Sequence, residues 1–317
     1  MKGTKDILKE SGKYVRELSI VVIGIAISFS INNWISDKSE KKDMKLYLGA
    51  IEVELERNVE KLELLKDHFE RAQEYSQFLN THEKALLEVG VTPYFVKTDG
   101  ISGCCTVMIS PDGERTMATF LGPAPTLKPD DITEETLAQY NCIYIEGYMI
   151  VNEPLVRSTM EKARRLGVKV ALDLSNFNIV NAFKDVLDDL ITNYVNILLS
   201  NEGEAKAFTG LEAREANLEL AKRVDISIVT LGKEGALVSA RGETVHVDAY
   251  GGKPLDTTGA GDNFAAGFLY GQSIGATLQQ SARIGSLLAG HVVAVIGPQI
   301  PAGEWEQIKL KVKEILA

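Results

Sequence analysis

Short apolar segments alternate with helix-like patterns along this chain after about residue 80, and this alternation limits the fold more than any other feature. Eight segments have the composition of strands: residues 104–110, 116–122, 141–148, 168–175, 195–201, 226–232, 236–240 and 244–250. Helical patterns lie between several of them, as at 153–166 and 213–224. Continuously apolar strands separated by helices are typical of a parallel sheet covered on both faces. The sequence therefore predicts an α/β fold whose ligand site lies at the carboxyl ends of the strands.

Charge and cysteine content exclude several classes of function. The formal net charge is -10 at pH 7, which disfavours a nucleic-acid partner because phosphates require clustered Lys and Arg. Cys104, Cys105 and Cys142 form neither an even disulfide framework nor a metal-binding spacing, which fits a reducing compartment. The four histidines belong to no HExxH pattern, so we expect no zinc site.

The stretch LDTTGAGDNFAAGFLYG, residues 255–271, places two glycines just before an apolar helical pattern at 263–270. Backbone N–H groups at a helix start have no intrahelical partner, and the helix dipole there favours negative charge. The absence of side chains at Gly259 and Gly261 would let an anion approach the backbone closely. Asp262 at the edge of such an anion site would accept a proton from a hydroxyl that attacks a phosphoryl group. The alternative is a tight turn with Asp262 as an ordinary helix cap.

The wider string DTTGAGDNFAAGF resembles the signature of the PfkB family of carbohydrate kinases, which includes ribokinase, fructokinases and adenosine kinases. SNEGEA (200–205) carries the family's Asn-x-x-Glu, and VTLGKEGAL (229–237) resembles its nucleotide-binding strand and turn. SPDGERTM (110–117) and YIEGY (144–148) look like the adenosine-kinase-like branch. The resemblance covers about residue 82 to the C-terminus and implies a three-layer αβα ribokinase-like fold with a mostly parallel sheet.

The resemblance also implies roles for individual residues. Asp262 would be the catalytic base, and the backbone of Gly259, Ala260 and Gly261 would stabilise the transferring phosphoryl group. Glu204, with Asn201 at i and i+3 on the same face, would organise water around Mg²⁺ and the phosphates of ATP. The residues that would hold the nucleotide are Thr230, Leu231, Gly232, Lys233, Glu234 and Gly235, with Ser286 and His291 on the adenine side. Asp256 and Thr258 would help to form a monovalent-cation site found in some members, for which K⁺ is the candidate ion.

The family's usual N-terminal part has no counterpart in this chain. That part begins with a strand carrying a substrate-binding Asp, continues into lid strands, and is followed by a Gly-Gly-x-x-x-Asn helix. The first Gly-Gly pair here is at 251–252, and residues upstream of His82 have a different character. The missing part supplies most contacts to the sugar or nucleoside acceptor and the lid that excludes water. The chain is therefore predicted to be an N-terminally truncated kinase domain whose acceptor cannot be read from its residues.

Residues 18–36 contain no charged side chain over 19 positions. As a helix they would extend about 28 Å, close to the ~30 Å thickness of a bilayer's hydrocarbon core. We expect a membrane anchor, although Ser28, Ser30, Asn32 and Asn33 leave a buried soluble helix open; a signal peptide would need a cleavage site that INNWISDK does not offer. Lysines flank both ends of this segment, so the charge distribution does not indicate which end faces the cytoplasm. The kinase domain is expected on the cytoplasmic side because its chemistry needs ATP. Residues 1–80 also resemble an uncharacterised group of bacterial single-span membrane proteins.

Residues 41–79 have the heptad pattern of a long amphipathic helix. Leu48, Leu55, Leu62 and Phe69 recur every seven residues, and Ile51, Asn58, Leu65, Ala72 and Leu79 form the companion positions. Such a seam is buried by a partner helix, so the pattern favours a homodimer, with packing inside one chain as the alternative.

Three domains are thus predicted: an anchor at 1–40, a coiled-coil-like helix at 41–80 and a kinase domain at 81–317. Three interpretations of the whole chain stay open. It is an active membrane-tethered sugar or nucleoside kinase, an inactive anchored nucleotide-binding or scaffold protein, or the product of a chimeric gene.

Overall fold

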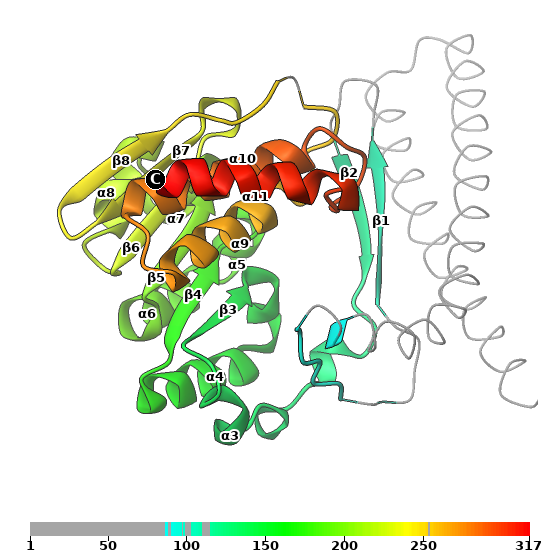
Figure 1. Cartoon of the computed structure of the whole chain (residues 1–317). Helices are drawn as coiled ribbons and strands as arrows, with labels where there is room; N and C mark the ends of the chain where they lie inside the picture. Colours follow the sequence, from blue (N-terminus) through cyan, green and yellow to red (C-terminus); the bar gives the residue numbers. More distant parts are fainter. Residues whose placement is uncertain (1–85, 88–89, 97, 99–102, 110–114, 253) are drawn as a thin grey trace, which may run out of the picture. The chain divides into compact units, whose positions relative to one another are not determined.

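The computed structural model describes residues 86–87, 90–96, 98, 103–109, 115–252 and 254–317 (Figure 1). The chain divides into two compact units, and the larger contains Pro123–Ala317. The smaller contains most of the strand pair β1 (Cys104–Ile109) and β2 (Arg115–Phe120). The predicted anchor at 18–36 and the predicted amphipathic helix at 41–79 lie outside the described residues. Within the described ranges, no helix combines the length and apolar character needed to span a membrane.

A sheet of six strands forms the centre of the larger unit among the described residues, in the order β3-β4-β5-β6-β7-β8. The strands are β3 (Cys142–Glu146), β4 (Lys169–Asp173), β5 (Ile197–Asn201), β6 (Ile226–Thr230), β7 (Ala236–Ala240) and β8 (Glu243–Val247). From β3 to β6 neighbouring strands are parallel, whereas β7 and β8 pair antiparallel with their neighbours. The predicted α/β fold with a mostly parallel sheet is therefore confirmed.

Helices connect the parallel strands and follow the sheet. They are α3 (Glu134–Leu137), α4 (Glu153–Leu166), α5 (Phe177–Ala182), α6 (Lys184–Tyr194), α7 (Glu202–Thr209), α8 (Ala213–Leu220), α9 (Ala260–Ser273), α10 (Leu278–Val292) and α11 (Trp305–Leu316). Helix α4 matches the predicted range 153–166, because the Asn152 side chain caps its start and Gly167, with φ of 73°, ends it. Helix α8 ends at Leu220, four residues before the predicted end, in a turn that leads into β6.

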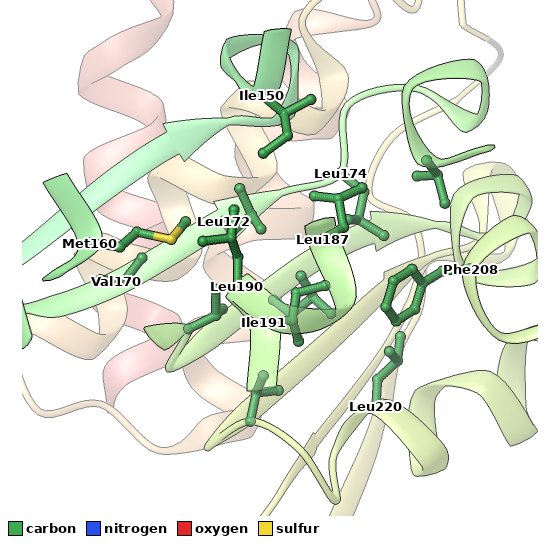
Figure 2. Packing of buried hydrophobic residues seen from close by; sticks show 14 of the residues in the cluster. Ile150, Met160, Val170, Leu172, Leu174, Leu187, Leu190, Ile191, Phe208 and Leu220 are labelled. Carbon is green, nitrogen blue, oxygen red and sulfur yellow. The ribbon is translucent and has the colours of Figure 1, made fainter. Parts of the chain in front are cut away.

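Two hydrophobic clusters cover the two faces of the sheet and define three layers. Alternate residues of one strand enter different clusters: Val170 and Leu172 pack with helices α4, α6, α7 and α8, whereas Ala171 packs with α9 and α10. Figure 2 shows the first cluster, in which Met160, Leu187 and Phe208 reach the sheet from three helices. Side chains that alternate between two apolar faces require a covering layer on each side. The fold therefore has the predicted αβα arrangement.

Helices α9 and α10 are packed backbone to backbone. A Cβ atom added at Gly267 would lie 2.7 Å from the backbone oxygen of Ile284 and 2.8 Å from the Cα of Gly285. Gly285 is equally tight, since its added Cβ would lie 2.8 Å from the oxygen of Phe264. Both glycines are fully covered in this contact. The close approach holds α9, whose start carries the GAGD motif (residues 259–262), against α10.

The first two predicted strands are not part of the main sheet. β1 and β2 form a separate two-stranded sheet, and only residues 110–114 separate them. A parallel neighbour needs a crossover of about a dozen residues or more, so this connection is too short to place them in a parallel arrangement. The same length argument explains the antiparallel pair β7 and β8, which a two-residue turn at Arg241 and Gly242 connects.

Candidate active site

Polar residues end four neighbouring parallel strands of the main sheet. These residues are Glu146 of β3, Asp173 of β4, Asn201 of β5 and Thr230 of β6. In the strand register Glu146 is opposite Asp173, and Asn201 is opposite Thr230. The sheet therefore presents a row of carboxylate, amide and hydroxyl groups at its carboxyl edge. Ligands of open α/β sheets bind at this edge.

The GAGD motif forms the first turn of α9. Gly259 is the N-cap with φ of 76°, and a Cβ there would lie 2.8 Å from the Cβ of Pro298. A Cβ at Gly261, in contrast, would meet no atom within 4 Å, so the surface over this residue is open. The helix begins at Ala260, three residues before the predicted start at 263, so Ala260 and Gly261 are helical. Asp262 is exposed in this first turn.

The amides of that first turn are not equivalent. The N–H of Ala260 donates to the carbonyl of Thr257 at 3.3 Å. The next two amides, of Gly261 and Asp262, stand at a helix start, where no preceding helical carbonyl can accept from them. A negatively charged group placed over Gly261 would therefore meet N–H donors and the positive end of the helix dipole.

The charge of Asp262 acts on the strand-end carboxyl groups. Burial raises the pKa of Glu146, and the charge of Asp262 and a contact between the two carboxyl groups raise it further, whereas a hydrogen bond from Ser175 lowers it. Burial also raises the pKa of Asp173 to about 7, with smaller contributions from the charges of Glu204, Glu146 and Asp262. Asp262, Glu146 and Asp173 thus form one electrostatically coupled group.

Tyr144 completes this group from the middle of β3. Its hydroxyl donates to Oδ2 of Asp173 at 3.4 Å, and burial followed by the charge of Asp173 raises its pKa. The sequence reasoning gave no role to Tyr144, Glu146 or Asp173. A usable signal was present, because each is a polar residue at or near the end of a predicted apolar strand.

Asn201 and Glu204 meet as predicted, as the capping box of α7. Glu204 is buried, with 4% of its surface exposed, and burial raises its pKa. In the part of the chain that the structure describes, no cluster of three or more His, Cys, Asp or Glu side chains could ligate a metal directly. A buried carboxylate held by Asn201 fits contact with Mg²⁺ through water better than direct ligation, because both of its oxygens already accept hydrogen bonds.

The predicted nucleotide-binding turn connects β6 to β7. Thr230 is the last residue of β6, the residues after Leu231 form a short 3₁₀ turn (Gly232–Glu234), and Lys233 and Glu234 are exposed. Gly235 has φ of 89° and ψ of -127°, a conformation that only glycine adopts easily. A Cβ at Gly235 would also lie 1.8 Å from the oxygen of Val247. The glycine is therefore needed to fit the turn against β8.

Ser286 and His291 of α10 both hold the segment after β8. The Ser286 hydroxyl donates to the carbonyl of Asp248 at 2.7 Å and accepts from the N–H of Tyr250 at 3.0 Å. The ring of His291 stacks on Tyr250 with 5.4 Å between centroids, and its Nδ1 lies 2.5 Å from a Glu304 oxygen. These contacts give both residues a structural role beside the one predicted for them.

Asp256 and Thr258 connect the loop before α9 to the loop after α10. Oδ1 of Asp256 accepts from the N–H and the hydroxyl of Thr258, at 2.9 and 2.7 Å, and Oδ2 accepts from the N–H of Gly297 at 2.9 Å. Asp256 is buried, with 7% of its surface exposed. These donors account for the burial of a carboxylate without requiring a cation.

Comparison with known proteins agrees with this geometry. The model of the "pfkB family carbohydrate kinase" matches residues 75–305. This chain belongs to the pfkB family. Among curated proteins, a ribokinase from Staphylococcus aureus is 26% identical over 186 residues (56% of this chain), and an adenosine kinase from Saccharomyces cerevisiae is 29% identical over 247 residues (71% of this chain). The solved structure of adenosine kinase from Sinorhizobium meliloti is 30% identical with a TM-score of 0.68, over 74% of each chain.

The chain matches only part of the length of its pfkB-family relatives. The chain spans 59% of the length of the ribokinase and 70% of the length of the yeast adenosine kinase. The curated relatives carry the names of a sugar kinase and a nucleoside kinase. A ribokinase-like protein from E. coli that shares the fold at 19% identity, with a TM-score of 0.62, was solved in complex with ATP and Mg²⁺.

Proposed function

We propose that this pfkB-family chain transfers the γ-phosphoryl group of ATP to a hydroxyl group of a sugar or nucleoside, with Asp262 as the general base. One arrangement carries the proposal: Asp262 is exposed in the first turn of α9, and its charge acts on the carboxyl groups of Glu146 and Asp173, which end β3 and β4. A hydroxyl held between these carboxyl groups would lose its proton to Asp262 as it attacks. The attack forms a bond from the acceptor oxygen to the γ-phosphorus while the bond to the β-phosphate oxygen breaks.

The anion hole in this proposal is the start of α9. The transferring group would lie over Gly261, where the structure leaves space, and the backbone of Gly259, Ala260 and Gly261 would stabilise its negative charge. Because Ala260 donates to Thr257, the amides of Gly261 and Asp262 would contribute most. The glycine at 259 serves the turn, and the glycine at 261 serves the approach of the phosphoryl group.

The nucleotide would lie along the strand ends next to this helix. Asn201 and Glu204 would order water around Mg²⁺, and the turn at 230–235 would contact the nucleotide. Ser286 and His291 would support the adenine side through their contacts to the 248–250 segment. Mg²⁺, when bound, neutralises phosphate charge; the residues of this chain orient it and supply the base.

A binding measurement and a transfer assay on the full-length chain test this function together. We expect calorimetry to detect Mg-ATP binding, and we expect a panel of sugars and nucleosides to contain an acceptor that is phosphorylated. Absence of Mg-ATP binding to a folded chain would contradict every kinase interpretation.

A second candidate is nucleotide binding without transfer. It is favoured by the sequence upstream of His82, which matches neither the acceptor-binding strand nor the Gly-Gly helix of the family. Tight Mg-ATP binding with no phosphorylated product from any acceptor would support this scaffold role. A chimeric gene product is the third interpretation, and continuous sequencing of transcript across codons 70–95 decides it.

We also propose that Asp256 and Thr258 contribute to a K⁺ site, because the family resemblance implies a monovalent-cation site in some members. The Asp256 side chain already accepts from Thr258 and Gly297, so a cation there would be held largely by other oxygens. Transfer or Mg-ATP affinity that is equal in K⁺ and in tetramethylammonium would remove this proposal.

For the N-terminal part we propose a membrane anchor at 18–36, with the kinase domain facing the cytoplasm. The support is the uncharged run in the sequence. We expect carbonate-resistant membrane association that is lost when residues 1–36 are deleted. Intact full-length protein in the soluble fraction would contradict the anchor.

We propose in addition that residues 44–79 hold a homodimer through their heptad seam. Tethering to one membrane would raise the effective concentration of neighbouring copies and favour pairing. Light scattering in detergent should give a dimer that Leu55→Glu with Leu62→Glu disrupts. A monodisperse monomer before mutation would mean that the seam packs within one chain.

A further inference from the structure

Ser175 has a backbone conformation that is unusual for a residue with a side chain. Its φ is 60°, and only Arg241 shares a positive φ among the non-glycine residues that the structure describes. Arg241 precedes Gly242 in the two-residue turn between β7 and β8, where two positive φ values are the rule. Ser175 lies in no hairpin; it is the central residue of a three-residue turn between β4 and α5, closed by a hydrogen bond from the N–H of Asn176 to the carbonyl of Leu174 at 2.7 Å. A turn of this kind with a side chain at its centre is rare, so the contacts that the Ser175 side chain makes there are informative.

The conformation brings the serine into contact with both neighbouring strand ends. Its N–H donates to Oδ1 of Asp173 at 2.6 Å, and its hydroxyl donates to Oε2 of Glu146 at 3.0 Å. The same hydroxyl oxygen accepts from the N–H of Gly147 at 2.7 Å. One hydroxyl thus connects the end of β3 to the end of β4 as donor and acceptor at once.

The facing segment after β3 is fitted to this contact. A Cβ at Gly147 would lie 2.6 Å from the oxygen of Asp173 and 2.7 Å from the oxygen of Leu174. Those atoms belong to the backbone and cannot move aside cheaply, so only glycine permits the approach of the two segments. The missing side chain at Gly147 lets the segment after β4 approach the end of β3. This approach brings the Ser175 hydroxyl within hydrogen-bond distance of the carboxyl group of Glu146.

We propose that Ser175 is a positioning residue that fixes the carboxyl group of Glu146 next to Asp262, in the place where the acceptor hydroxyl is oriented. The inference rests on the proposed function for the role of that site, but the contact itself does not. A glutamate side chain has three rotatable bonds, and repulsion from Asp262 would turn an unrestrained carboxylate toward solvent. The donor on Ser175 opposes that repulsion by favouring the charged form of Glu146.

The direct test is the titration of the Glu146 carboxyl group in the full-length chain. Carbon-13 NMR of glutamate-labelled protein reports its midpoint, and Glu146→Gln identifies the signal. Ser175→Gly removes the hydroxyl while glycine accepts the positive φ, so the fold should be kept. We expect the midpoint to move upward in Ser175→Gly. Arg241→Gly is the matched control, since it also relieves a positive φ but lies outside the site, and it should leave the midpoint in place.

An unchanged midpoint in folded Ser175→Gly would overturn the proposal. If that variant does not fold, Ser175→Ala removes the same hydroxyl and gives the same readout. Where the parent transfers phosphate, Ser175→Gly should also lower kcat/KM for the acceptor about tenfold, the change expected for one hydrogen bond to a charged group, with KM for ATP unchanged. The titration needs no turnover, so a chain without transfer activity would remove the proposed function while the midpoint still decides the role of Ser175.

Discussion

Asn201 and Glu204 bind each other through three hydrogen bonds at the start of α7. The N–H and the side-chain amide of Asn201 donate to the two oxygens of Glu204, at 2.9 and 2.7 Å, and the Glu204 N–H donates back to Oδ1 of Asn201 at 2.9 Å. The pair closes the helix start and holds a buried carboxylate at the site. The atoms that would order water around Mg²⁺ in the proposed function are therefore the same atoms that stabilise the helix start.

Glu204→Gln should weaken both roles. Gln can accept only through one oxygen, so one of the two donors of Asn201 loses its acceptor. We expect a loss of about 0.5–2 kcal/mol in the free energy of unfolding, the size of a helix-cap effect, and a higher Mg²⁺ requirement for nucleotide binding. Urea unfolding and calorimetry over a range of Mg²⁺ concentrations measure the two effects. Glu202→Gln, an exposed neighbour in the same helix turn, is the control: it also removes a negative charge from the helix start but is not part of the capping box, so it should cost less stability and leave the Mg²⁺ requirement unchanged.

Asp173→Asn should change how stability depends on pH. The folded-state pKa of Asp173 is raised to about 7, against about 3.9 in the unfolded chain. Between about pH 4 and 7 the folded chain then binds more protons than the unfolded chain, so its stability falls as pH rises. The contribution of Asp173 is thus present at low pH and lost through this window.

The asparagine variant cannot ionise and should escape that loss. We expect it to unfold with about 1–3 kcal/mol more free energy than the parent at pH 8, and with little or no advantage at pH 4. Urea unfolding at pH 4, 6 and 8 measures the difference. Asp130→Asn, at an exposed position, should show no such trend. An equal difference at all three pH values would mean that Asp173 does not titrate in this window.

Gly267→Ala tests the close contact between α9 and α10. The new methyl group would meet the backbone of Ile284 and Gly285 at less than 3 Å, so the helices must separate. We expect a net loss of about 1–3 kcal/mol in thermal or urea unfolding, even though alanine favours the helix. Gly303→Ala, where an added Cβ meets no atom within 4 Å, is the matched control. A Gly267→Ala variant as stable as the parent would contradict this packing.

The sequence predicted the parts of this fold that depend on local pattern. The strand at 236–240 and the helix at 153–166 appear at the predicted residues. The strand is marked by its continuous apolar sequence, and the helix by a capping Asn152 before it and Gly167 after it. The sequence analysis did not predict that β1 and β2 form a sheet of their own, because the composition of a strand does not indicate which strand it pairs with. Connection length does carry that information.

The sequence assigned roles only to residues of its strongest motifs, and it gave none to Tyr144 and Glu146 although both lie in the string YIEGY. Asp262, Asn201 and Glu204 lie in strings that resemble a known signature. Asn201 ends β5, Glu204 follows in the first turn of α7, and the charge of Asp262 acts on Glu146 and Asp173 at two other strand ends. Tyr144 and Glu146 come from β3, and Asp173 and Ser175 from β4 and the residues just after it. Their association follows from strand order and register, which sequence spacing does not contain.

Asp262→Asn gives the most direct test of the central claim, that Asp262 is the base of a phosphoryl transfer. The assay compares kcat for transfer from Mg-ATP to the best acceptor in the parent, in Asp262→Asn and in the exposed control Asp130→Asn. We predict that Asp262→Asn loses about two to four orders of magnitude in kcat, the scale of a missing general base, with ATP affinity and the control unchanged. Equal turnover by Asp262→Asn and the parent would contradict the account.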